Sequence, residues 1–160
     1  MGMRKVALIT DGWRRLFTYA WPAGILQRIR ETGEDVNLYI FNSTGNWSRD
    51  AGYNRAEYNI YNLPELSDFD GIILELNNIS SPAVLADVIS NAKRSGRPVV
   101  SIANELGDFY YVGIDNYSAM KQVIAHLHEV HDCKKFWLLV GAQDNYESSC
   151  RLQGMLDYAK

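Results

Sequence analysis

The sequence predicts an α/β fold built on a doubly wound parallel sheet. Short apolar runs alternate along the chain with longer amphipathic stretches, which is the pattern of repeated strand–helix–strand units. Turn and capping residues such as Gly33, Ser81-Pro82 and Gly96 separate these segments where such units need them. With 160 residues, the chain is long enough to enclose one hydrophobic core.

Six short apolar runs are predicted to form strands. Each has the length of an ordinary strand, and most are rich in branched aliphatic side chains, as strands buried on both faces are. Turn signals lie beside several of them, such as Asp11-Gly12 after the first and Asp70-Gly71 before the third. The predicted strands are Val6–Thr10, Val36–Phe41, Ile72–Leu76, Pro98–Ile102, Tyr110–Ile114 and Lys134–Val140.

The stretches between these runs are predicted to form helices. Ser81 is the expected N-cap of one helix, with Pro82 at its first helical position, and Pro22 is expected in the first turn of another. Asp144-x-x-Glu147 resembles a capping box at the start of the last helix. The predicted helices are Thr18–Thr32, Asn54–Asn62, Pro82–Arg94, Tyr117–Val130 and Tyr146–Tyr158.

Composition and charge argue against several classes of partner. The net charge is −3, and Lys and Arg are scattered rather than gathered on one segment, which is unlike a nucleic-acid-binding surface. No apolar stretch reaches the roughly 18 residues of a membrane span, and no secretory signal is evident. The two cysteines, Cys133 and Cys150, lack metal-ligand spacing. A reduced, cytoplasmic protein is the expectation.

Candidate site residues are those that directly follow each predicted strand, because ligands of doubly wound sheets bind beyond the carboxyl ends of the strands. Amide and carboxylate side chains there offer directional hydrogen bonds to hydroxyl or amide groups of a ligand. The alternative is that they only cap helices and make turns. We favour capping for Asp115, Asn116 and Asp144, and ligand binding for Asp11, Asn77 and Asn78. The polar positions after strands are Asp11, Asn42, Asn77, Asn78, Asn104, Glu105, Asp115, Asn116 and Gln143.

Motifs of several enzyme classes are missing from the sequence. No glycine-rich phosphate loop follows the first strand, and no G-x-S-x-G nucleophile elbow is present. A response-regulator receiver needs an acidic pair after its first strand and an Asp after its third, where this chain has a lone Asp11 and the Asn77-Asn78 pair. No catalytic residue and no cofactor is therefore predicted. The enzyme alternative is a small hydrolase or isomerase that uses Asp11 or Glu105 as a base.

The histidines form the most unusual local pattern, His126-x-His128-x-x-His131. His128 and His131 are three residues apart, as two metal ligands on one helix face can be. Histidines at a helix C-terminus also interact favourably with the helix dipole, and we favour that interpretation over a metal site. Cys150 has no histidine near it in sequence, so a catalytic thiol is not predicted.

Four motifs in the second half of the chain carry a resemblance to a known family. They are Val112-Gly113-Ile114-Asp115-Asn116, Ala125-His126-Leu127, Lys134 to Gly141, and Cys150-Arg151-Leu152-Gln153-Gly154-Met155. In combination they resemble the sensor domain of the lactose- and galactose-repressor family. The resemblance implies a periplasmic-binding-protein fold of type I, in which two α/β lobes enclose a ligand between them. It implies lobe boundaries of 1–112 and 113–160, with the second lobe truncated.

The resemblance also implies roles for particular residues. The arginine of the Arg-Leu-x-Gly motif, here Arg151, points into the cleft and binds the ligand in that family. A planar guanidinium suits bidentate contact with hydroxyls or a carboxylate. On the first lobe's side of the cleft we expect Asp11 together with aromatic rings able to stack on a sugar or a base. These rings are Trp13, Tyr19 and Trp21.

Departures from the family narrow the expected function. No helix-turn-helix segment precedes the first strand, and Asp132 stands where the family favours glycine. We therefore expect a sensor module for a small polar metabolite, sugar-like or nucleoside-like, that signals by lobe closure. The input domain of a diguanylate cyclase is one such module. An exposed strand edge in the truncated lobe predicts a homodimer. A pure oligomerisation scaffold is the remaining alternative.

Overall fold

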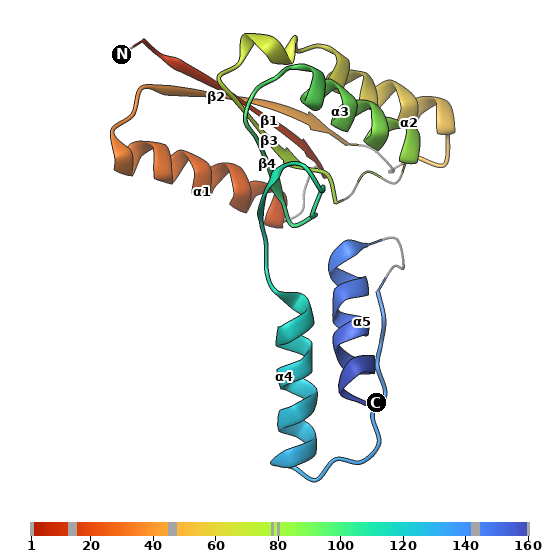
Figure 1. The fold of residues 1–160 in the computed structure, drawn as a ribbon. Coiled ribbons are helices and arrows are strands. Elements are labelled where there is room, and N and C mark those ends of the chain that lie inside the picture. The colour runs from red at the N-terminus through yellow and green to blue at the C-terminus, as the bar shows by residue number, and fades with distance from the viewer. Residues whose placement is uncertain are drawn as a thin grey trace.

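The structure is a computed structural model that describes residues 2–12, 16–44, 48–77, 79, 81–141 and 145–159. Over these residues its centre is a five-stranded parallel sheet with the order β2-β1-β3-β4-β5 (Figure 1). The predicted doubly wound parallel sheet is confirmed, and the first five predicted strands all lie in it. The strands are β1 (Arg4–Asp11), β2 (Val36–Ser43), β3 (Gly71–Glu75), β4 (Val99–Ile102) and β5 (Tyr110–Val112).

The strand order reverses direction at β1. The chain first moves from β1 to β2 on one side, and then returns to place β3 on the other side of β1. In doubly wound sheets, ligands bind beyond the carboxyl ends of the two strands at such a reversal, here β1 and β3. This topological switch point lies at Thr10 and Asp11 on β1 and at Glu75 on β3, since Thr10 pairs with Glu75 in the strand register.

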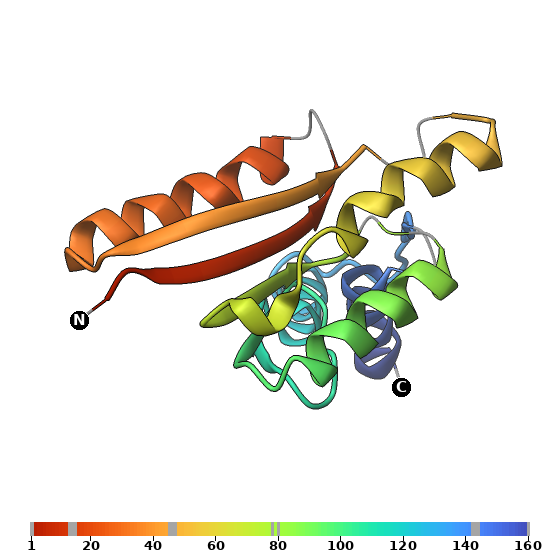
Figure 2. The same cartoon turned by 90° about the horizontal axis from the view of Figure 1, so that it is seen from above.

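The main hydrophobic core lies on one face of this sheet. It is covered by α3 (Pro82–Arg94) and by two short 3₁₀ segments, η1 (Tyr58–Asn62) and η2 (Leu66–Asp68), that follow α2 (Ala51–Glu57). Side chains of alternate strand residues such as Ile72 and Leu74 point into it and are almost completely buried. The opposite face is flanked by α1 (Leu16–Thr32), as Figure 2 shows from above.

Most of the predicted starts and ends of the helices are confirmed. Ser81 caps α3, its side chain accepting a hydrogen bond from the Val84 amide, and Gly33 ends α1 at a φ of 64°. Two details were wrong. Pro22 lies inside α1 rather than in its first turn, because the helix begins earlier, at Leu16. The predicted helix Asn54–Asn62 starts at Ala51 and tightens into the 3₁₀ segment η1 from Tyr58 onwards.

Beyond the sheet, α4 (Asn116–Glu129) and α5 (Tyr146–Tyr158) pack against each other (Figure 1). The two helices run in the same direction, and residues 134–140 lead back alongside α5 from the end of α4 to the start of α5 (Figure 1). The predicted strand Lys134–Val140 is not paired, since a strand needs a neighbouring strand and residues 113–141 and 145–159 contain none. The capping box was also misplaced: Asn145 caps α5, accepting from the Ser148 amide, and Asp144 lies outside the described residues.

Gly154 explains how closely α4 and α5 approach. A β-carbon at this buried position would overlap the Tyr117 carbonyl oxygen and would lie 3.2 Å from the Tyr117 carbonyl carbon. Because the obstructing atoms belong to the backbone of α4, they cannot move aside as the tip of a flexible side chain can. The glycine of the Arg-Leu-x-Gly motif is therefore needed for helix packing. In the described part of the chain, no helix is long and apolar enough to cross a membrane.

Gly154→Ala should weaken the packing of α4 on α5. The added methyl forces the two helices apart, and overpacking of this kind costs about 1–3 kcal/mol. Urea unfolding followed by circular dichroism measures the change. Gly24→Ala is the matched control, because Gly24 is an exposed glycine inside α1 with no atom within 4 Å of an added β-carbon. That variant should gain about 0.5–1 kcal/mol from helix propensity. Equal behaviour of the two variants would contradict the packing role.

Candidate functional site

Buried polar side chains gather at the carboxyl edge of the sheet. Asp11 ends β1, Ser43 ends β2 and Glu75 ends β3, and none of the three is more than 4 % exposed. Charged side chains are rarely buried so completely unless they have partners. Two carboxyl groups at the switch point thus mark this edge as the most unusual polar environment of the sheet.

Hydrogen bonds tie these strand ends to one another and to η1. The Thr10 hydroxyl donates to Glu75 Oε2 over 2.8 Å, and the Tyr61 hydroxyl donates to the Thr10 carbonyl oxygen over 2.9 Å. The Gly12 amide donates to the Ser43 carbonyl oxygen over 3.1 Å, which extends the pairing of β1 and β2 beyond the strands. The carboxyl ends of β1, β2 and β3 are thereby fixed as one platform.

The pKa of Tyr61 reflects the negative charge of this platform. Its side chain is 3 % exposed, and burial raises the pKa of its hydroxyl far above the ordinary value of a tyrosine. The negative charges of Asp11 and, to a smaller extent, Glu75 raise this pKa further, while a hydrogen bond with Ser43 opposes them. Neutral donors are therefore favoured at the switch point, where buried acceptors predominate.

The N-terminal ends of α4 and α5 face this carboxyl edge (Figure 1). Near those ends Arg151 of α5 donates through Nη1 to Asn116 Oδ1 of α4 over 2.7 Å. Asn116 in turn donates to Glu147 Oε1 and to the Ile114 carbonyl oxygen, at 3.4 and 3.3 Å. Arg151 is half-buried, and Asn116 orients its guanidinium with one bond while other donors of the group remain.

A side-chain bridge links α5 to the sheet side of the chain. The Tyr146 hydroxyl donates to Glu105 Oε2 over 2.7 Å, and the Tyr146 ring lies edge-on to Tyr111 of β5 with centroids 6.4 Å apart. The hydrogen bond to Glu105 raises the pKa of Tyr146. Glu105 lies in the loop after β4, so this bridge spans the short connection from β5 to α4.

The loop after β4 holds a non-glycine residue in the left-handed region. Ala103 has a φ of 61°, and its amide donates to the Val112 carbonyl oxygen over 2.9 Å. The Ser101 hydroxyl fixes the same turn by donating to the Asn104 carbonyl oxygen over 2.6 Å. Left-handed backbone at an L-residue costs about 1 kcal/mol or more and tends to persist at functional sites. Here it directs the chain toward Glu105.

The predicted site residues fall into separate groups. Asp11 lies in the buried platform, Glu105 in the bridge, and Arg151 in the contact between α4 and α5. Tyr19 is 59 % exposed near the start of α1, and Trp21 and Asn77 are half-buried. The roles of these three in ligand binding stay predictions. Trp13, Asn78 and Gln143 lie outside the described residues.

Capping explains one of the other polar positions. The Asp115 side chain accepts from the Ser118 amide over 2.9 Å and begins α4, as predicted. Asn116 does not cap the helix but holds Arg151, which the sequence did not indicate. Glu75 and Tyr146 were also missed. A charged residue in an otherwise apolar run, Ile72 to Leu76, was the one available signal for Glu75.

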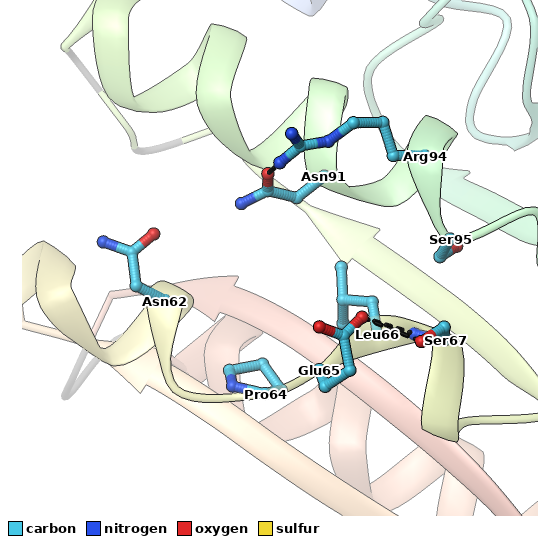
Figure 3. A pocket seen from close by; sticks show the side chains of 8 residues that line it. All are labelled: Asn62, Pro64, Glu65, Leu66, Ser67, Asn91, Arg94 and Ser95. Atoms are coloured by element: carbon cyan, nitrogen blue, oxygen red, sulfur yellow. Dashed lines mark hydrogen bonds between the residues drawn. The ribbon is translucent and has the colours of Figure 1, made fainter.

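A polar groove of about 400 Å³ lies elsewhere, between the segment before β3 and the last turns of α3 (Figure 3). Its side chains already bind one another: the Ser67 hydroxyl donates to Glu65 over 2.8 Å, and Arg94 donates to Asn91 over 2.5 Å. The groove is at the amino ends of the strands, away from the switch point. Among residues that the structure describes, no group of three or more His, Cys, Asp or Glu side chains is placed to hold a metal ion.

Solved structures decide the fold. The chain aligns with a glucose-galactose binding protein, GanP, from Geobacillus stearothermophilus at a TM-score of 0.69 and 20 % identity, covering 99 % of this chain and 54 % of that protein. This chain has the periplasmic-binding-protein fold of type I. An ABC transporter solute binding protein from Burkholderia multivorans aligns at a TM-score of 0.68 and 21 % identity, covering 99 % of this chain and 56 % of that one.

A transcription regulator, CcpA of Lactococcus lactis, aligns with the same fold at a TM-score of 0.67 and 19 % identity, covering 98 % of this chain and 53 % of its own. The chain thus spans about half the length of the structures it matches. No protein-family model and no curated protein matches the sequence. The resemblance to repressor-type sensor domains is confirmed at the level of the fold.

Tyr61→Phe should reduce the loss of stability at alkaline pH. In the wild type, an unfolded tyrosine releases its proton near pH 10 whereas buried Tyr61 keeps its own. The unfolded state then binds fewer protons, so the free energy of unfolding falls as pH rises, by up to about 1.4 kcal/mol per pH unit. Urea unfolding between roughly pH 9 and 11 measures this slope. Tyr110→Phe, at a residue 73 % exposed, should keep the wild-type slope; a slope unchanged in Tyr61→Phe contradicts the assignment.

Proposed function

We propose that this chain forms part of a ligand-binding sensor for a small polar metabolite, sugar-like or nucleoside-like. The observation that carries the proposal is the arrangement at the switch point. The carboxyl edge of the sheet, where Asp11 and Glu75 are buried, faces helix N-termini beside which Arg151 is held by Asn116 (Figure 1). Polar strand ends on one side and a guanidinium on the other suit a ligand with several hydroxyl groups. Similarity to a glucose-galactose binding protein supports the same class of ligand.

The proposed mechanism is closure on the ligand of two parts of the chain, one containing the sheet up to β5 and the other containing α4 and α5. The connection between β5 and α4 is only Gly113 to Asp115, which suits a hinge. The Tyr146–Glu105 hydrogen bond spans that hinge and orients α5 relative to the loop after β4. A ligand that contacts both sides stabilises the closed arrangement by its differential affinity for it.

Binding is favoured over catalysis. The neighbours are named as binding proteins and a transcription regulator. Of the two bases that the enzyme alternative requires, Asp11 is completely buried and Glu105 accepts a hydrogen bond from Tyr146.

The output of the proposed sensor and its location stay predictions. A diguanylate cyclase as the output domain has no support from the named neighbours. A cytoplasmic location fits the two free cysteines, Cys133 and Cys150, which are not joined in a disulfide.

Binding is tested by titrating the protein with galactose, glucose, ribose and adenosine in a calorimeter and in a thermal-shift assay. At least one should bind and raise the melting temperature without being consumed. Arg151→Ala should weaken that binding about tenfold or more, because a lost hydrogen bond to a charged group costs about 1.5–3 kcal/mol. Arg28→Ala, an exposed arginine of α1 paired with Glu31, is the control and should bind like the wild type. No binding by any of the four, or equal binding by Arg151→Ala, would falsify the proposal.

The proposed sensor is expected to be a homodimer. Residues 134–140 alternate between half-buried side chains, Phe136 and Leu138, and the exposed side chains Trp137 and Leu139, which are 100 % and 99 % exposed. This alternation is that of a strand with one face covered, and such an edge favours pairing with another chain. Antiparallel self-pairing would also keep Lys134 and Lys135 apart from their copies.

Trp137→Lys combined with Leu139→Lys should convert a dimer to a monomer in light scattering. Both side chains are exposed in the single chain, so the variant's melting temperature should stay near that of the wild type at high dilution. Leu63→Lys removes another exposed leucine, 71 % exposed and distant in sequence, and should leave the dimer intact. A wild type that remains a monomer at high concentration contradicts the expectation.

A further inference from the structure

The turn after α4 brings two histidines together. His126 lies in the last turn of α4 and His131 in the turn that follows, and their Nε2 atoms are 3.1 Å apart. The two rings are nearly perpendicular, with an interplanar angle of 79° and centroids 4.9 Å apart. The sequence drew attention to His128 and His131, whereas the structure pairs His131 with His126.

Backbone hydrogen bonds fix this turn. The Val130 amide donates to the His126 carbonyl oxygen and the Cys133 amide donates to the Leu127 carbonyl oxygen, each over 3.0 Å. Asp132 adopts a left-handed conformation with a φ of 51°, which reverses the chain. The position of His131 above His126 therefore follows from the backbone and does not depend on the side chains alone.

The spacing of the two nitrogens suits a transition-metal ion. Zinc binds histidine nitrogen at about 2.0–2.1 Å, so two such ligands on a tetrahedral ion lie about 3.3 Å apart. Neighbouring ligands of an octahedral ion at the same bond length lie about 2.9 Å apart. The observed 3.1 Å falls between these values. The separation of the two nitrogens is therefore that of two imidazole ligands on one ion.

We propose that His126 and His131 form a two-histidine chelate for a divalent transition metal such as Zn²⁺, Ni²⁺ or Cu²⁺. Imidazole nitrogens favour these ions over Mg²⁺ or Ca²⁺, which prefer oxygen ligands. Both side chains are exposed, so an ion reaches them from solvent. Since the described residues offer no set of three ligands, the remaining coordination positions are open to water or to a donor from another molecule.

His128 provides a matched control on the same helix. It is also exposed, but its Nδ1 lies 3.0 Å from the Tyr158 hydroxyl on α5 rather than beside another imidazole. A single histidine cannot chelate. Cys133 is the other soft ligand near the turn, and its sulfur donates to the His131 carbonyl oxygen over 3.8 Å. Its part in binding is separated by a Cys133→Ser variant.

The test is calorimetric titration of the untagged, metal-free chain with Zn²⁺, and with Ni²⁺ as a second probe. We expect one ion per chain, an affinity about tenfold or more lower in His126→Ala and in His131→Ala, and wild-type affinity in His128→Ala and Cys133→Ser. Mg²⁺ should not bind at the same concentrations. Folding of each variant is checked by circular dichroism and by its melting temperature without metal.

Three outcomes would overturn the proposal. The first is a wild type that takes up no ion, the second is equal binding by His126→Ala and the wild type, and the third is a loss in His128→Ala as large as in His131→Ala. None of these results bears on sugar or nucleoside binding, because the histidine pair lies at the C-terminal end of α4, the opposite end from Asn116 and Arg151.

Discussion

The reversal of strand order at β1 is the constraint on which the rest of this structure depends. Because β2 and β3 flank β1 on opposite sides, the polar ends of three strands meet at one place. Two carboxyl groups are buried there, Thr10 donates to Glu75, and Tyr61 ties the edge of β1 to the layer above it. A buried polar group without partners would cost several kcal/mol, so these bonds and the strand order stabilise one another.

The same constraint explains what could be predicted from the sequence. Strands such as Val6–Thr10 and Ile72–Leu76 were found because burial on both faces makes the whole run apolar, and α3 because Ser81 and Pro82 define its start. Strand order has no local signature, so the switch point could not be located from the sequence. Asp11 was expected at the site because it follows a predicted strand. Glu75 lies within the predicted strand Ile72–Leu76, and Tyr61 comes from a separate 3₁₀ segment, so their positions at the site could not be predicted in the same way.

The errors of prediction have a common physical origin, since each depended on a partner that the sequence does not reveal. Residues 134–140 have the composition of a strand, yet no neighbouring strand is present in the part of the chain that the structure describes. Asn116 was interpreted as a local capping residue, whereas its side chain binds Arg151, 35 positions away. His128 and His131 share a helical spacing, but the helix ends at Glu129. The turn that follows places His131 beside His126 rather than beside His128.

Gly154 connects the packing of the second part to the candidate site. The contact of Gly154 with the Tyr117 backbone sets how closely α4 and α5 lie, and Arg151 stands one turn before it on the same helix. At that separation the guanidinium reaches Asn116 in the first turn of α4, and Tyr146 at the start of α5 reaches Glu105 beside the sheet. A wider helix pair would move both side chains together. The orientation of Arg151 and the bridge to the sheet are therefore two consequences of one close helix contact.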